Sequence, residues 1–246
     1  MENNIENNNF LIKNIIKPST QIYYITEILK KEGYKDIWNK IDFAESIGRN
    51  DLIKLLVQLG EKGTGCAIDY AAYYGQLDSV KYLISLNYKV TDLSFIFATM
   101  NCHLHILEYF HSELNLKGPK NLIEMAVFNG DLNTVKYLIS LNYKVNDESF
   151  IKAVKNDHLH ILEYFHSELN LKGPKNLIDY AAEEGNLDII KYLISQNYKV
   201  NDESFIKAVK NDHSHILEYF YDELNLRGPD NLIDIAIMYY LSISFN

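Results

Sequence analysis

The stretch that decides the fold is residues 176–201, NLIDYAAEEGNLDIIKYLISQNYKVN, because it carries two apolar stripes separated by a glycine. Apolar residues at 177, 178, 181 and 182 follow the spacing i, i+1, i+4 and i+5, which predicts a short helix with one buried face. Gly185 is a residue type that commonly ends a helix, and apolar residues at 189, 190, 193 and 194 then repeat the spacing. The stretch is therefore predicted to be a helical hairpin.

The hairpin belongs to an internal repeat. Residues 121–175 return at 176–230, and the same frame runs back to residue 66 and forward into the truncated segment 231–246. Each of these blocks contains two units, because one alanine starts an equivalent pattern in each unit. These alanines are Ala44, Ala71, Ala98, Ala126, Ala153, Ala181, Ala208 and Ala236. Their period falls in the range of about 20 to 50 residues that is typical of solenoids, in which one supersecondary element cannot bury its apolar face alone.

The recurring small residues predict how the units pack. An alanine in each first helix allows the first helices of neighbouring units to approach closely, and the residue three positions earlier is always apolar. The residues at that earlier position are Ile41, Ile68, Phe95, Ile123, Phe150, Ile178, Phe205 and Ile233. We therefore expect an all-α protein whose core runs from unit to unit.

The two ends of the chain depart from the regular pattern. Residues 1–40 are predicted to be a polar tail and a degenerate capping unit, with Ile25, Ile28 and Leu29 on a second helix and Gly33 in its turn. Pro18 is expected to interrupt the first helix of that unit. Residues 41–246 are predicted to be an array of about seven units plus a truncated last one, in which a first helix stops after Tyr240 without its partner.

Composition excludes several classes of function. The 246 residues carry 24 basic and 33 acidic side chains, a formal charge of −9, and the only arginines are Arg49 and Arg227, so nucleic acid is not an expected partner. Cys66 and Cys102 are too few for a disulfide framework and lack zinc spacing. There is neither a signal peptide pattern nor a membrane-spanning run, so we expect no membrane partner and a cytoplasmic protein.

Two motifs could suggest chemistry. His103 and His105 recur as His158/His160 and His213/His215, but histidines two apart do not share a helix face and no further ligand type recurs beside them, so the first of each pair is assigned to the turn between helices. Residues 60–65, GEKGTG, lack the full spacing of a phosphate-binding loop and are predicted to be a turn between units. We therefore expect no enzymatic activity, no metal and no cofactor.

The hairpin sequence resembles the ankyrin repeat, whose conserved pattern is matched from about residue 41 to the C-terminus. The matching residues of one unit are Ala181, Ala182, Gly185, Leu187, Ile190, Leu193, Val200 and Asn201. The units are shorter than the usual length of about 33 residues, so the fold implied is an ankyrin-type helical-hairpin solenoid with shortened inter-unit fingers. Tight turns are expected at Asn201-Asp202 or Gly173-Pro174, and Asp157, Asp212 or Cys102 replaces the helix-ending glycine in alternate units.

The resemblance implies a protein partner bound along the concave side, and a monomer. With short fingers, the second and third positions after each alanine should carry the contact. The candidate residues are Tyr73, Tyr74, Met100, Phe128, Asn129, Lys155, Glu183, Glu184 and Lys210. Their character changes from aromatic and thioether side chains to charged ones along the chain, and Tyr73, Tyr74, Met100 and Phe128 are expected to form one exposed apolar ladder.

These short units, rich in Asn, Ile, Lys and Tyr, resemble the ankyrin proteins encoded by giant DNA viruses of amoebae. The leading hypothesis is thus a viral module that binds a host protein. One alternative is a substrate adaptor of a ubiquitin ligase, as in poxvirus ankyrin proteins, although no Leu-Pro box is visible. A helical-repeat nucleic-acid binder, opposed by the negative charge, and a catalytic or regulatory protein with an unrecognised site are the others.

Overall fold

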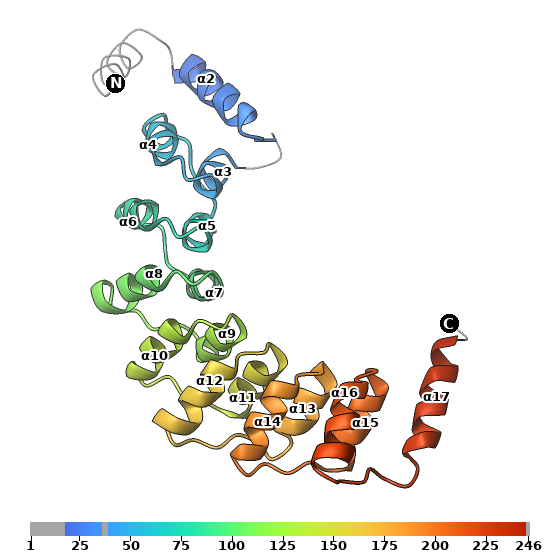
Figure 1. Cartoon of the computed structure of the whole chain (residues 1–246). Coiled ribbons are helices and arrows are strands. Elements are labelled where there is room, and N and C mark those ends of the chain that lie inside the picture. Colours follow the sequence, from blue (N-terminus) through green and yellow to red (C-terminus); the bar gives the residue numbers. More distant parts are fainter. Residues whose placement is uncertain (1–17, 36–38, 245–246) are drawn as a thin grey trace, which may run out of the picture. The chain divides into compact units, whose positions relative to one another are not determined.

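The computed structural model of the chain describes residues 18–35 and 39–244, and all regular elements within these ranges are helices (Figure 1). This confirms the expected all-α, helical-hairpin fold. The chain divides into two compact parts, with the boundary between Pro119 and Lys120, and each part is described by itself.

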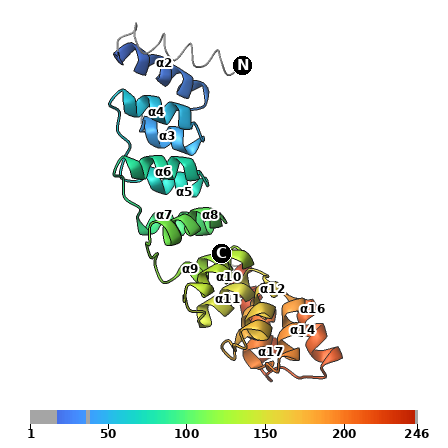
Figure 2. The same ribbon diagram turned by 90° about the vertical axis from the view of Figure 1, so that its left-hand side faces the viewer.

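The first part is a stack of helical hairpins behind an N-terminal helix. The first helices α3, α5 and α7 contact one another in order, and each packs against its own second helix, α4, α6 or α8 (Figures 1 and 2). Helix α2 contacts α3 and α4. The elements are α2 Pro18–Lys31, α3 Lys40–Ser46, α4 Asn50–Gln58, α5 Ala67–Tyr73, α6 Leu77–Ser85, α7 Asp92–Met100, α8 Leu104–Glu108 and the π-helical η1 Tyr109–Glu113.

The second part repeats this plan. Its first helices α9, α11, α13, α15 and α17 contact one another in order. The elements are α9 Leu122–Phe128, α10 Leu132–Ser140, α11 Asp147–Lys155, α12 Leu159–Glu163, η2 Tyr164–Glu168, α13 Leu177–Glu184, α14 Leu187–Ser195, α15 Asp202–Lys210, α16 Ser214–Glu218, η3 Tyr219–Glu223 and α17 Leu232–Ser244.

The core lies at the positions expected from the repeat. All the recurring alanines from Ala44 to Ala208 are fully buried, and so, to within a few per cent, are the apolar residues three positions before them. The exception is Ile233, which is 74% exposed on α17. The stack is held mainly by apolar burial between neighbouring first helices.

Three π-helical segments account for the alternation in unit length. The units that begin at Ala98, Ala153 and Ala208 are each one residue longer than the unit before them, and they are the units that contain η1, η2 and η3. The wider turn of a π-helix absorbs one inserted residue without shifting the register of the next unit. Its other effect is to bury Phe165, whose ring centroid lies 5.0 Å from that of Phe150.

The helix ends test the expected turns. Gly185 has a φ of 76°, and Asp157, Asp212 and Cys102 have φ values of 59°, 58° and 59°, so the predicted left-handed replacements are confirmed. The expected tight turn at Asn201-Asp202 is wrong, because Asn201 caps α15 with its side chain while Asn197, at φ 67°, makes the turn.

The ends of the chain differ from the expectation in one respect. Helix α17 does not stop at Tyr240 but continues to Ser244, because no residue at the position equivalent to Gly185 ends it. At the other end, Ile25 and Leu29 of α2 are buried, Ile28 is exposed, and Gly33 follows at φ 99°. Pro18 is the first residue of α2, and the helix expected before it lies outside the described residues.

Each histidine pair forms hydrogen bonds with carbonyl groups at the end of the first helix of the preceding unit. The Nε2 of His103 bonds the carbonyl oxygen of Tyr73 at 3.0 Å, and that of His105 bonds the carbonyl of Gly75 at 3.1 Å. The last carbonyls of a helix have no partner within it, so the next unit supplies the donors. The first histidine is at the N-cap of α8, in the turn between helices, as expected, and the two ring centroids lie 5.9 Å apart.

We expect Gly185→Ala to cost much more stability than Gly60→Ala. Both glycines have positive φ, so an alanine at either position costs about 1–2 kcal/mol of backbone strain. A Cβ at Gly185 would also lie 2.7 Å from the His213 ring, whereas nothing lies within 4 Å of one at Gly60. The overpacking adds ~1–3 kcal/mol. Urea denaturation of the two variants measures the difference, and equal losses would show that the His213 ring yields without cost.

Acidic residues of the first helices hold the start of the next unit. Asp69 is 2% exposed and accepts hydrogen bonds from the hydroxyls of Thr91 at 2.7 Å and Ser94 at 2.5 Å. Thr91 and Ser94 form the capping box of α7, and Asp179 repeats the contact with Ser204 at 2.6 Å.

Candidate functional site

The exposed ends of the first helices form the candidate site. Helix α5 buries Ala67, Ile68, Ala71 and Ala72 on one face. Its residues Tyr70 and Tyr73 are exposed and face away from the core. Helices α7, α9, α11, α13 and α15 bury the same four positions of their units. The surface can therefore be described position by position in each part.

In the first part, this surface is aromatic. Tyr73 and Tyr74 are 42% and 47% exposed, and their ring centroids lie 4.8 Å apart in an edge-to-face arrangement. The Tyr73 ring also meets the edge of Phe97 on α7, with centroids 5.6 Å apart. Tyr70, one turn before Tyr73, and Met100, one turn after Phe97, are 41% and 42% exposed. We call these five residues the aromatic surface.

In the second part, Phe128 and Asn129 lie at the end of α9. Phe128 is 47% exposed, and Lys152 Nζ lies 5.8 Å from its ring centroid, while Asn129 is half-buried. Three members of the expected ladder, Tyr73, Tyr74 and Met100, are exposed in the first part, whereas Phe128 belongs to the other part. Lys152 is thus a cationic neighbour of the Phe128 ring. Among the described residues, no cation–π contact involves the Tyr73 ring.

Further along the second part the surface is charged. Glu183 on α13 lies between two lysines, 3.1 Å from Lys207 Nζ and 3.6 Å from Lys155 Nζ, and Glu184 lies 3.9 Å from Lys155 Nζ. Lys210 is exposed one turn after Lys207. We call these five residues the charged surface.

Electrostatics within the charged surface are mutually favourable. Burial acts to raise the pKa of Glu183, but Lys207 and Lys155 outweigh it and hold that pKa below its usual value. The hydrogen bond to Glu183 raises the pKa of Lys207. Because these side chains are about a third exposed, such pairs contribute little to stability, and they fix the arrangement of charges that a partner would meet.

Sequence reasoning missed Tyr70, Phe97 and Lys207. All three stand immediately before a repeat alanine, at Ala71, Ala98 and Ala208. In a helix this position lies one turn before the second and third positions after the alanine, so all of them share one face. The sequence could therefore have predicted these three residues, because the position immediately before the alanine is recognisable in every unit.

Other chemistry has little support in the described part of the chain. No group of three or more His, Cys, Asp or Glu side chains there could hold a metal ion. None of the described helices is long and apolar enough to cross a membrane. The GEKGTG segment runs from the left-handed turn at Gly60 to the start of α5, so it is a connection between units.

Comparisons with known proteins agree with this architecture. Residues 123–204 match the family model described as ankyrin repeats, in three copies. The chain is 36% identical over 91 residues to an ankyrin repeat protein of Acanthamoeba polyphaga mimivirus, a match that covers 35% of the chain and 16% of that protein. A second ankyrin repeat protein of the same virus is 25% identical over 148 residues, covering 56% of the chain and 22% of that protein. The aligned regions thus span less than a quarter of either relative.

Proposed function

We propose that the chain, whose residues 123–204 match ankyrin repeats, is an interaction module that binds another protein through the exposed ends of its first helices. The observation that carries the proposal is the aromatic surface, in which four aromatic rings and a methionine gather on two neighbouring helices without being buried. Tyrosine in particular contributes strongly to interface energies, and exposed apolar clusters mark partner sites.

The proposal includes the second part of the chain. Phe128, Asn129, Lys155, Glu183, Glu184 and Lys210 occupy the equivalent helix positions, and they would add charge complementarity to the apolar contact of the aromatic surface. Because both matched relatives are proteins of a virus of Acanthamoeba, we extend the proposal to a partner from the host cell, met in its cytoplasm.

We expect Tyr73→Ser with Tyr74→Ser to reduce partner capture by more than tenfold, because two interface tyrosines together contribute at least a few kcal/mol. The matched control is Tyr23→Ser with Tyr24→Ser, a pair on α2 that is also exposed and edge-to-face, with centroids 5.8 Å apart. The measurement is quantitative affinity purification from Acanthamoeba extract with parent and both variants, beside their melting temperatures.

The outcomes separate binding from folding. The proposal expects proteins captured by the parent and by the control variant to be lost with Tyr73→Ser and Tyr74→Ser at an unchanged melting temperature. Capture that survives this double change, or that falls equally in the control, would contradict a role for the aromatic surface. The charged surface would then be the remaining candidate.

A further inference from the structure

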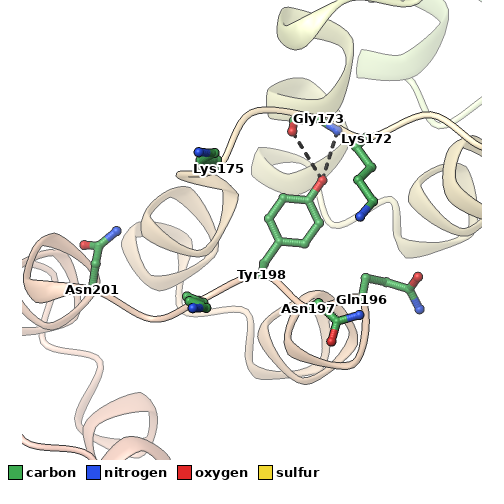
Figure 3. A pocket seen from close by; sticks show the side chains of 8 residues that line it. Lys172, Gly173, Lys175, Gln196, Asn197, Tyr198 and Asn201 are labelled. Carbon is green, nitrogen blue, oxygen red and sulfur yellow. Dashed lines mark hydrogen bonds between the residues drawn. The ribbon is translucent and has the colours of Figure 1, made fainter.

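A hollow of about 550 Å³ lies in the second part, between the loop that precedes α13 and the turn that precedes α15 (Figure 3). Lys172, Gly173 and Lys175 come from the loop, and Tyr198 and Lys199 come from the turn. Gln196, Asn197 and Asn201 complete its lining. Its volume is in the range of small-molecule sites.

The walls of the hollow are held in place. The Gly173 amide donates to the Tyr198 hydroxyl at 2.9 Å, as Figure 3 shows, and His166 Nε2 contacts the same hydroxyl at 3.3 Å. On its other side Gly173 lies so close to Phe150 that a Cβ there would be 2.5 Å from the ring. Lys172 and Lys175 therefore extend from a backbone that is fixed by packing and by hydrogen bonds.

The hollow is basic in an acidic chain. Its lining contains three lysines and no carboxylate, although the chain carries a formal charge of −9. Asp179, behind Asn201, accepts from Ser204 and from the Asn201 amide, so its oxygens are engaged. Asp147 is near enough to contribute to the raised pKa of Tyr198, after burial, but it does not line the hollow. The amide side chains and the tyrosine hydroxyl add uncharged hydrogen-bonding groups.

The first part contains an equivalent hollow without this charge. It measures about 490 Å³ and keeps the same framework, in which the Gly63 amide donates to the Tyr88 hydroxyl at 2.8 Å. There Glu61 stands where the second part has Leu171, and it lies 3.7 Å from Lys40 Nζ. Gly65 stands in place of Lys175, and Leu86 in place of Gln196. The framework is thus shared by both hollows, and the excess of lysine distinguishes the hollow of the second part from that of the first.

We propose that the hollow lined by Lys172, Lys175 and Lys199 binds a small polyanion through its phosphate or carboxylate groups. The space is larger than one oxyanion needs, and its three lysines come from both walls, so it suits a ligand with several anionic groups. Lysine ammonium groups act as point charges toward phosphate and carboxylate, and the amides lining the hollow can donate further hydrogen bonds. This site is separate from the aromatic surface and is independent of the proposed partner binding.

The test is a titration of the full ¹⁵N-labelled chain at low salt, with the Gly173 amide resonance as reporter. The probes are inorganic tripolyphosphate and citrate, which distinguish phosphate from carboxylate recognition. A local reporter is needed because the preceding block of the repeat carries the same lysines as Lys117, Lys120 and Lys144. We expect a saturable shift with at least one probe, and the tighter probe identifies the preferred group.

Variants assign the binding to the hollow. Replacing Lys172, Lys175 and Lys199 together by alanine should weaken binding by about tenfold or more, since three exposed charge pairs are lost. Arginine at the same positions should retain most of it. The control replaces Lys54, Lys81 and Lys136 by alanine, which removes the same charge from exposed positions on the second helices α4, α6 and α10. A Gly173 resonance that does not shift, or equal weakening in both alanine variants, would overturn the proposal.

Discussion

At pH 9, Glu45→Ala is expected to stabilise the first part of the protein by several kcal/mol relative to the parent. Glu45 lies on α3 with no exposed surface, and neither of its carboxylate oxygens has a hydrogen-bond partner in the described part of the chain. The nearby Ser79 hydroxyl is directed to Asn50. The equivalent residues Ala72 and Ala182 are fully buried alanines, so the position accepts a methyl group without strain.

The effect should depend on pH in a defined direction. Burial raises the pKa of Glu45 from 4.5 to about 8, with Ser79 opposing the shift and the Asp42 charge adding to it. Because the folded-state pKa lies above the unfolded one, the stabilising contribution of the protonated group is complete below pH 4.5 and is lost as the pH rises through 8. The full change is on the order of 4–5 kcal/mol.

The measurement compares parent and Glu45→Ala in hydrogen exchange of a peptide spanning residues 40–58, at matched pH values from 5 to 9. Titrations of other groups affect both proteins and cancel in the difference. The difference should grow with pH toward 9, and Glu45→Gln should also remove the pH dependence. A constant difference between pH 5 and pH 9 would mean that Glu45 is ionised and solvated throughout.

The local part of the fold could be predicted from the sequence because it rests on spacing within one unit. The stripe at Leu177, Ile178 and Ala181 is buried as expected, and the left-handed residue at Asp157 follows from its place after a first helix. These features depend on helix geometry and on backbone sterics, and both can be read from a few consecutive residues.

Contacts between units could not be predicted in the same way. The carbonyl of Tyr73 is bonded by His103 of the next unit, and Asp69 is bonded by Thr91. Duplication alone explains why histidines and acidic residues recur at these positions, so their recurrence did not indicate that they contact the neighbouring unit. The π-helices were missed for a related reason: the alternation in unit length was visible, but nothing in the sequence showed where the extra residue is accommodated.

The candidate site was predicted in part for the same physical reasons. Exposed helix positions follow from the buried ones, so the exposure of Tyr73, Tyr74 and Met100 could be predicted. The pairing of Glu183 with Lys207 was not, because ion pairs between units depend on side-chain reach across neighbouring helices. Glu45 shows the converse case. Glutamate is common on exposed helix faces, but Glu45 is fully buried at a position where other units carry small residues such as Ala72 and Val127.

The second large effect is expected from Ala181→Asp, which should destabilise the second part by about 3–5 kcal/mol because it leaves a buried charge without a partner. Ala181 has no exposed surface and lies on α13, which contacts α11, α14 and α15.

Ala181→Ser is the matched control, because its hydroxyl is small and can bond a backbone carbonyl of its own helix. Hydrogen exchange should rise in α11, α13 and α15 of the Asp variant, since a stack of repeats transmits a loss of stability first to its neighbours. Lowering the pH from 7 to 3 should recover part of the loss by neutralising the new carboxyl. Exchange that matches the parent in all three helices would mean that Ala181 is not packed between neighbouring first helices. Close helix packing would then not explain why an alanine recurs in every unit.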